Sequence, residues 1–323
     1  MNKLVLIVGG STLVYACLAL MMGVLPGIEL SRVAAGPGVQ PLTALQDEGR
    51  AVYVANGCGY CHTQQVRPLG QDKVFGRPSI AGDFKYQTPE LLGSERTGPD
   101  LTNIGVRQPS EVWQYIHLYN PRAVVPESIM PSFNWLFDVV GQAPAGMTPV
   151  PLPKAYAPAQ GVVVPTHKAE ALIAYLASLK QQPLPAAEMA GDESAMASPP
   201  AATSTPEAAA GGYDAAKGGA LFTANCSACH QASGEGLPGA FPPLKGNDVV
   251  NAADAAKHMQ VVLQGLHGNK VGGVIYGSAM PPFAGTLSDT EIADIIDYER
   301  SSWGNHGQPV TPAQVAAERA KTK

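Results

Sequence analysis

The first strong pattern along the chain is an uninterrupted apolar run near the N-terminus. From Leu4 to Leu25 the residues are apolar or small, and no charged residue stands between Lys3 and Glu29. A helix of about 22 residues rises roughly 33 Å, which is enough to cross a bilayer. The apolar core of a cleaved signal peptide is usually shorter, about 7–15 residues. We therefore expect a retained transmembrane anchor over residues 1–30, with a cleaved signal peptide as the alternative.

Charged residues at the two ends of this run indicate its orientation. Lys3 and the amino terminus precede the run, while Glu29 and Arg32 follow it. The slight excess of positive charge in front favours a cytoplasmic N-terminus. The rest of the chain is then expected outside the cytoplasm, and a cleaved signal peptide would export it as well.

Helical periodicity returns in two later segments. Ser288 and Glu291 form a capping-box pattern ahead of an apolar face, and Thr166 is predicted to cap a similar helix. The spacing of the apolar residues places them on one side of each helix. They are Leu172, Ile173, Tyr175, Leu176 and Leu179 in the first helix and Ile292, Ile295 and Ile296 in the second.

An internal repeat indicates a partner helix for each of these two. When the two halves of the chain are aligned, Gly49 falls on Gly218 and Tyr53 falls on Phe222. A glycine lets a crossing helix approach closely, and the aromatic ring is expected to pack into the crossing. We therefore expect two domains of one fold, each built around two crossing helices.

Composition bounds the rest of the structure. The 323 residues include 35 glycines and 29 prolines, which excludes a compact helical bundle and predicts long irregular stretches. Residues 183–212 are rich in Ala and Pro and are expected to form a flexible linker. Gly141 to Pro165 is a second Pro-rich stretch, expected as a surface insertion. The net charge of -5 disfavours a nucleic-acid-binding protein, which needs a basic surface.

Four of the five cysteines occur in two matching motifs. Cys58 and Cys61 lie in CGYCH, and Cys226 and Cys229 lie in CSACH. Both are C-x-x-C-H, the attachment signature of c-type haem. Two thiols at this spacing can form thioethers to one haem, and the next histidine then faces the iron. A zinc site or a redox dithiol fits less well, because the pairs are far apart and no thioredoxin-like pattern is present; a disulfide within C-x-x-C would be strained.

Each haem iron needs a second axial ligand, and two methionines suit that role. Met130 lies in ESIMPSF after His62, and Met280 lies in GSAMPPF after His230. The proline after each methionine fixes the chain direction and has no amide N–H to satisfy. Thioether ligation raises the reduction potential, and a six-coordinate iron transfers electrons rather than binding a substrate. His117 is a rival ligand in the first half, although a structural or propionate-side role suits it better.

The order of these features in each half resembles a class I cytochrome c: a helix, the haem motif, irregular loops, a methionine and a final helix. This resemblance implies that a proline carbonyl accepts a hydrogen bond from Nδ1 of the axial histidine. The candidates are Pro99 in TGPDL and Pro242 in FPPL. Such a bond would orient His62 and His230 and raise their basicity.

From Pro41 to Phe137 the chain resembles one family closely. It is similar to the mono-haem subunit II of cbb(3)-type cytochrome c oxidases, through the segments TALQDEGRAVYVANGCGYCHTQQVRP, RTGPDL and HLYNPRAVVPESIMPSFNWLF. The resemblance implies a transmembrane helix and a periplasmic cytochrome domain on the bacterial inner membrane, with haem held by Cys58 and Cys61. It implies His62 and Met130 as axial ligands, and electron transfer to an integral haem–copper subunit that reduces oxygen.

The chain departs from that family by its insertion and by a second domain that resembles small soluble class I cytochromes c. The expected fold class is mainly α. The expected organisation is a transmembrane anchor over 1–30, a cytochrome domain over 31–182, the linker over 183–212 and a second cytochrome domain over 213–323. A tether of this kind keeps an electron carrier near its acceptor at an effective concentration of up to about millimolar order.

Together these patterns predict a non-catalytic electron-transfer subunit with two covalently bound haem c groups. Electrons would pass from a donor cytochrome c or a quinol-oxidising complex to the C-terminal haem, then to the N-terminal haem and the catalytic subunit. Other oxidase subunits are further expected partners. The alternatives are the same role in a C-family nitric oxide reductase, a free-standing membrane dihaem cytochrome c, and a catalytic cytochrome such as a peroxidase.

Overall fold

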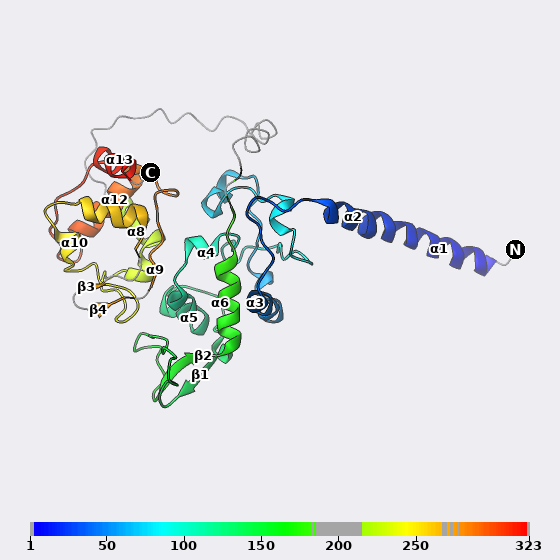
Figure 1. Cartoon of the computed structure of the whole chain (residues 1–323), viewed down its shortest axis with the longest axis horizontal. Coiled ribbons are helices and arrows are strands. Elements are labelled where there is room, and N and C mark those ends of the chain that lie inside the picture. Colours follow the sequence, from blue (N-terminus) through cyan, green and yellow to red (C-terminus); the bar gives the residue numbers. More distant parts are fainter. Residues whose placement is uncertain are drawn as a thin grey trace. The chain divides into compact units, whose positions relative to one another are not determined.

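The structure is a computed structural model that describes residues 3–182, 184, 215–266, 270–271, 274–276 and 278–321. Its elements are almost all helices joined by long irregular segments (Figure 1). The mainly α fold class predicted from the sequence is confirmed. Apart from Leu184, the predicted linker 183–212 lies outside the described residues.

The chain begins with one long apolar helix (Figure 1, blue). It comprises α1 (Lys3–Ala19), a π-helical turn η1 (Leu20–Val24) and α2 (Leu25–Arg32). The π-turn precedes Pro26, which has no N–H to continue the α-helical hydrogen bonds. The mean hydropathy reaches 2.2 and none of the helix is buried. By length and composition this helix can cross a membrane, but a signal sequence has the same properties, so the retained anchor stays a prediction.

Residues 61–102 form loops and two short 3₁₀ turns, η3 (Gly70–Phe75) and η4 (Ala81–Phe84). Two fully buried carboxylates, Asp72 and Asp100, hold the loops together. Arg96 donates to Asp72 at 2.6 Å, and Arg67 donates to it at 2.9 Å. These hydrogen bonds from Arg67 and Arg96 hold the pKa of Asp72 well below its usual range. A charged network therefore gives this irregular segment a fixed path.

The first pair of crossing helices is α3 (Ala44–Ala55) and α6 (His167–Ser178). Gly49 is buried at the crossing, where an added Cβ would lie 1.9 Å from the Ala171 carbonyl oxygen. The Tyr53 ring packs edge-on against Tyr175, with 5.6 Å between the ring centroids. The close approach predicted for this glycine and aromatic residue is confirmed.

Two short helices and a hairpin complete this region. They are α4 (Ile104–Arg107), α5 (Glu111–Tyr119) and the antiparallel strands β1 (Phe137–Val140) and β2 (Val162–Pro165). The predicted insertion from Gly141 to Pro165 is therefore a hairpin connection together with its returning strand. Three further 3₁₀ turns are η2 (Cys58–Tyr60), η5 (Pro121–Ala123) and η6 (Asn134–Leu136).

Thr166 precedes α6 as predicted, but its side chain does not cap the helix. The hydroxyl instead donates to the carbonyl oxygen of Leu136 at 2.8 Å. The reason is tertiary: pairing of β1 with β2 brings the chain before β1 next to the residue that follows β2. The capping role predicted for Thr166 is wrong: its hydroxyl is turned toward the Leu136 carbonyl, and its oxygen accepts no N–H of the first turn.

The second pair of crossing helices is α8 (Ala215–Asn225) and α12 (Asp289–Ser301). An added Cβ on Gly218 would lie 2.4 Å from the Asp294 carbonyl oxygen. Phe222 packs against Tyr298 and Trp303, with centroid distances of 5.3 and 5.1 Å. The capping box at the start of α12 is formed as predicted.

The remaining described elements of the C-terminal part surround this crossing. They are α9 (Ser227–His230), α10 (Asp248–Asn251), α11 (Ala256–Gln264), α13 (Pro312–Ala320) and the two-residue strands β3 (Lys270–Val271) and β4 (Val274–Ile275). Helices α11, α12 and α13 share one apolar core built from Met259, Leu263, Ile292, Ile296 and Val315.

Candidate haem sites

The C-terminal haem motif occupies the chain directly after α8. Its last four residues form the single-turn helix α9, and the backbone N–H of His230 donates to the Cys226 carbonyl at 3.0 Å. The His230 ring is buried, and its Nδ1 lies 2.9 Å from the Pro242 carbonyl oxygen. The hydrogen bond expected between these two residues is therefore present.

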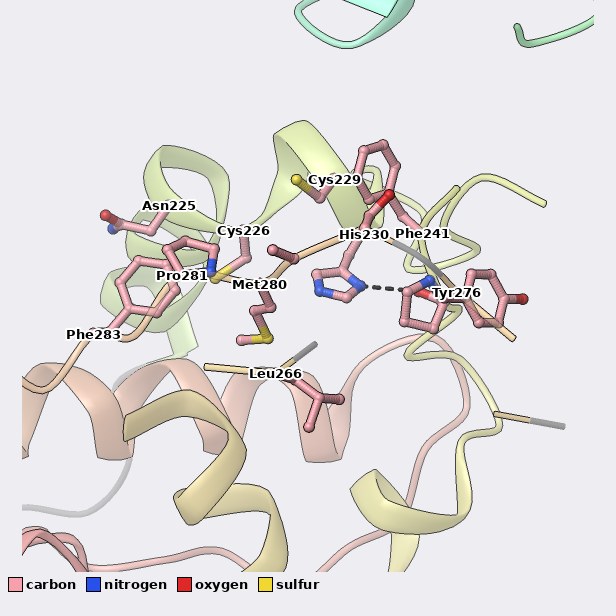
Figure 2. A pocket seen from close by; sticks show the side chains of 13 residues that line it. Asn225, Cys226, Cys229, His230, Phe241, Leu266, Tyr276, Met280, Pro281 and Phe283 are labelled. Carbon is pink, nitrogen blue, oxygen red and sulfur yellow. Dashed lines mark hydrogen bonds between the residues drawn. The ribbon is translucent and has the colours of Figure 1, made fainter. Parts of the chain in front are cut away.

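A cavity opens beside this motif. Figure 2 shows the His230 ring and the Met280 side chain projecting into it, with the two cysteines of the motif at its edge. Most of its other lining is apolar or aromatic: Phe241, Leu266, Tyr276, Pro281 and Phe283.

Electrostatics of this cavity suit a neutral metal-binding imidazole. Burial lowers the pKa of His230, so the ring is neutral near pH 7. Burial also raises the pKa of the Cys226 thiol, and it raises that of Cys229 to about 12. When Nδ1–H donates to the Pro242 carbonyl, Nε2 keeps its lone pair for a metal. The residues present therefore fit a covalently attached haem whose iron faces His230.

Backbone hydrogen bonds fix the position of Met280. Its N–H donates to the Leu266 carbonyl at 2.8 Å, and the Leu266 N–H donates back at 3.1 Å. Gly265 has a φ of +73°, and a Cβ there would lie 2.4 Å from the Met280 carbonyl oxygen. The sequence analysis overlooked Gly265, although a glycine directly after an apolar helical run is a recognisable signal.

The N-terminal haem motif is held in a similar way. Nδ1 of His62 lies 2.8 Å from the Pro99 carbonyl oxygen, and the Gly98 N–H donates to the Cys61 carbonyl at 2.9 Å. A Cβ on Gly98 would lie 2.2 Å from the His62 ring. Only glycine leaves room for the imidazole here, so the Gly-Pro pair both clears space for the ring and supplies its acceptor.

Asp100 links the segment that follows His62 to the segment that contains Pro99. Its carboxylate accepts hydrogen bonds from the Thr63 hydroxyl at 2.6 Å and from the Gln65 N–H at 2.9 Å. Arg96 also donates to the Thr63 hydroxyl, at 2.7 Å. Within RTGPDL, the sequence pointed to a role for Pro99 but to none for Arg96 or Asp100, which the structure shows to anchor the residue that follows His62.

Two other candidates of the N-terminal half have less defined roles. Met130 is half-buried, and its N–H donates to the Ser128 hydroxyl at 3.3 Å. Its pairing with His62 stays a prediction. His117 lies on α5 with its ring stacked on Trp113, at 4.5 Å between centroids and 12° between planes. This contact is consistent with the structural role preferred for His117.

Comparison with known proteins identifies both halves of the chain. Residues 1–150 match the family described as cytochrome C oxidase, mono-heme subunit/FixO, and residues 215–303 match the cytochrome c family. Cytochrome c-552 of Thermus thermophilus is 34% identical over 125 residues, which cover 32% of this chain and 95% of that protein. The chain belongs to the cytochromes c. It joins a FixO-type mono-haem region to a class I cytochrome c domain, and the resemblances inferred from its motifs are confirmed.

This cytochrome c is also similar to parts of larger subunits. The cytochrome c subunit of the quinone-dependent alcohol dehydrogenase of Gluconobacter oxydans is 37% identical over 86 residues, which cover 27% of this chain and 18% of that subunit. The cytochrome c subunit of gluconate 2-dehydrogenase of Pantoea cypripedii is 28% identical over 103 residues, 32% of this chain and 23% of that subunit. Two cytochrome c regions imply covalently bound haem c and a role in electron transfer.

Proposed function

We propose that this cytochrome c is the membrane-anchored dihaem electron-transfer subunit of a cbb(3)-type cytochrome c oxidase. The observation that carries the proposal is the match of residues 1–150 to the FixO family, which implies association with the catalytic subunit of such an oxidase. The apolar helix ahead of the first haem motif supports it. The proposed organisation is an anchor over 1–30, cytochrome domains over 31–182 and 213–323, and a linker over 183–212.

Each haem motif is proposed to hold one haem c, which gives the subunit two one-electron centres. The proposed ligands are Cys58, Cys61, His62 and Met130 for the first haem and Cys226, Cys229, His230 and Met280 for the second. Pro99 and Pro242 act through the histidines: each carbonyl accepts the Nδ1 proton, fixes the plane of the ring and increases its basicity. The largely apolar lining at His230 disfavours bound water and favours electron transfer over ligand exchange.

The proposed direction of electron transfer is from the C-terminal haem to the N-terminal haem and then to the haem–copper subunit. A second domain of the class I type supports this order, because such domains are the usual small electron carriers and the chain tethers this one to the FixO-type region. We place the N-terminus in the cytoplasm and both haem domains in the periplasm, on the bacterial inner membrane.

Purification of the complex from the membrane provides the test. We expect two covalent haems per chain on a haem-stained gel and by pyridine haemochrome analysis, with an integral haem–copper subunit in the same preparation. We expect the preparation to consume oxygen. Nitric oxide consumption instead of oxygen consumption would assign the subunit to a nitric oxide reductase, and absence of an integral catalytic subunit would leave a free-standing cytochrome.

Single-motif variants test the path. We expect Cys58→Ala to abolish oxygen consumption with every donor, because the haem next to the catalytic subunit is disrupted. Cys226→Ala should abolish it with the physiological donor but preserve it with a small artificial reductant that reaches the first haem directly. Full activity of Cys226→Ala with the physiological donor would contradict the proposed order.

The similarity to dehydrogenase cytochrome subunits favours a second candidate function. In that case the chain accepts electrons from a membrane dehydrogenase rather than from a soluble donor. Co-purification with a dehydrogenase subunit, and reduction of the haems by its substrate, would support this candidate over the first.

A further inference from the structure

A buried ionisable pair lies beside the proposed C-terminal haem. His258 on α11 is 3% exposed and Glu299 on α12 is 4% exposed. His258 Nε2 lies 2.8 Å from the Glu299 Oε2 atom. Both residues line a cavity whose wall also includes His230 and Met280. The pair therefore borders the space in which the haem is proposed to lie.

The other ring nitrogen of His258 lacks a protein partner. Within the described residues, Nδ1 of His258 is buried and makes no hydrogen bond. Buried polar atoms in proteins are almost always hydrogen-bonded, so such an atom in the wall of a cavity points to a missing ligand. With Nε2–H donated to Glu299, a proton on Nδ1 is available to an acceptor in the cavity.

The lining of the cavity contains few side chains that could bind an anionic group. None of the described residues that line it is a Lys or Arg. The nearby Arg300 is committed elsewhere, because it donates to the carbonyls of Val250, Ala252 and Gln308. The neighbouring carboxylate of Asp297 is also used elsewhere, because it accepts a hydrogen bond from the Val310 N–H. Haem carries two carboxylates, and the buried Nδ1 of His258 is a position in this wall from which a proton can be donated to one of them.

We propose that His258 binds a propionate carboxylate of the C-terminal haem through Nδ1, and that Glu299 positions His258 by accepting its Nε2 proton. This inference rests on the proposed function only in requiring a haem at Cys226 and Cys229. In the bound form the His258 ring donates hydrogen bonds to two carboxylates, that of Glu299 and that of the propionate, and so offsets part of their negative charge. His258 therefore raises the reduction potential of this haem above that of an otherwise equal site without these hydrogen bonds.

The test uses the full haem-loaded chain in detergent. His258→Gln keeps a side-chain amide that reaches the Nε2 position and Glu299, but it removes the Nδ1 donor. We expect two haems per chain, and a shift of the propionate bending band in the resonance Raman spectrum. At the wild-type midpoint potential, the ratio of reduced to oxidised C-terminal haem should fall about tenfold, which corresponds to about 59 mV for one electron. The N-terminal haem is the internal reference, and His306→Gln, at an exposed histidine of the same domain, is the matched control.

A second variant separates positioning from direct contact. Glu299→Gln keeps an oxygen that can accept from Nε2 while it removes the negative charge, so the Raman band should stay in place and the potential should rise. An unchanged band and potential in His258→Gln would overturn the proposal. So would a Glu299→Gln variant without a shift in potential, even if the His258 variant failed to accumulate. Fewer than two haems in the unmodified chain would instead contradict the proposed function.

Discussion

Two adjacent glycines in α8 allow the packing of the second helix crossing to be measured. A Cβ on Gly218 would lie 2.4 Å from a backbone oxygen of α12, whereas real Cβ atoms essentially never approach closer than 3.0 Å. A Cβ on Gly219 would meet the ring edge of Tyr298 at 3.1 Å, and a side chain can yield by that small amount. The two positions share one helix and differ in what they face.

The expected difference in stability between Gly218→Ala and Gly219→Ala follows from two effects. Replacing a glycine in a helix interior by alanine gains about 1 kcal/mol of helix propensity, and this gain is common to both variants. Overpacking against a rigid backbone costs about 1–3 kcal/mol and applies only to Gly218→Ala. The propensity gain cancels in the comparison, so Gly218→Ala should be less stable than Gly219→Ala by roughly 1–3 kcal/mol. For a domain of about 100 residues, each kcal/mol corresponds to roughly 4–8 °C in melting temperature.

Denaturant and thermal unfolding of the two haem-loaded variants provide the assay. The Met-to-iron absorption band of the C-terminal haem reports this domain, and the unfolding of the N-terminal haem domain is the internal control. The same midpoint for both variants would show that α8 and α12 are not in close contact in solution. That result would refute the inference that a glycine at this position sets the helix crossing.

Three further predictions concern the haem sites and their supports. Met280→Ala should leave the C-terminal haem attached but lower its potential in a redox titration, because the thioether is lost. Burial raises the pKa of Asp297 from an ordinary 3.8 to about 6, so the native state binds this proton more tightly than the unfolded chain, and stability is lost as pH rises through 6. The free energy of unfolding of Asp297→Asn should therefore exceed that of the wild type by on the order of 2 kcal/mol at about pH 7.5 and equal it at about pH 3.5, as measured by denaturant titration. Asp100→Asn removes the charge beside Arg96, and it should lower the free energy of unfolding of the N-terminal haem segment by about 1–3 kcal/mol without changing the C-terminal haem.

The parts of the fold that were predictable are those encoded by neighbouring residues. The apolar helix, the haem motifs and the glycine of each helix crossing are each recognisable within a few positions, because one residue type decides the local structure. The capping role of Thr166 could not be judged in this way, since its hydroxyl bonds to Leu136, which only strand pairing brings close.

The charged and polar supports of the two sites were the least predictable parts. Asp72 meets Arg96, and His258 meets Glu299, across 24 and 41 residues of irregular or helical chain. No periodicity or short motif records such a contact, because it depends on how whole segments fold back on one another. Gly98 was only partly predictable: the sequence shows that it precedes Pro99, but it does not show that the His62 ring packs against it.

Main-chain hydrogen bonds attach the segment that carries Met280 to the end of α11, beside the apolar packing of its side chains. Besides the pair of bonds to Leu266, the N–H groups of Phe283 and Ala284 donate to carbonyls of Val262 and Leu263. These main-chain bonds do not require a particular side chain at position 280. As the proposed axial ligand, Met280 could therefore be exchanged for another donor by a single codon change while these bonds are kept, which makes this position a natural place for evolution to retune the electron carrier.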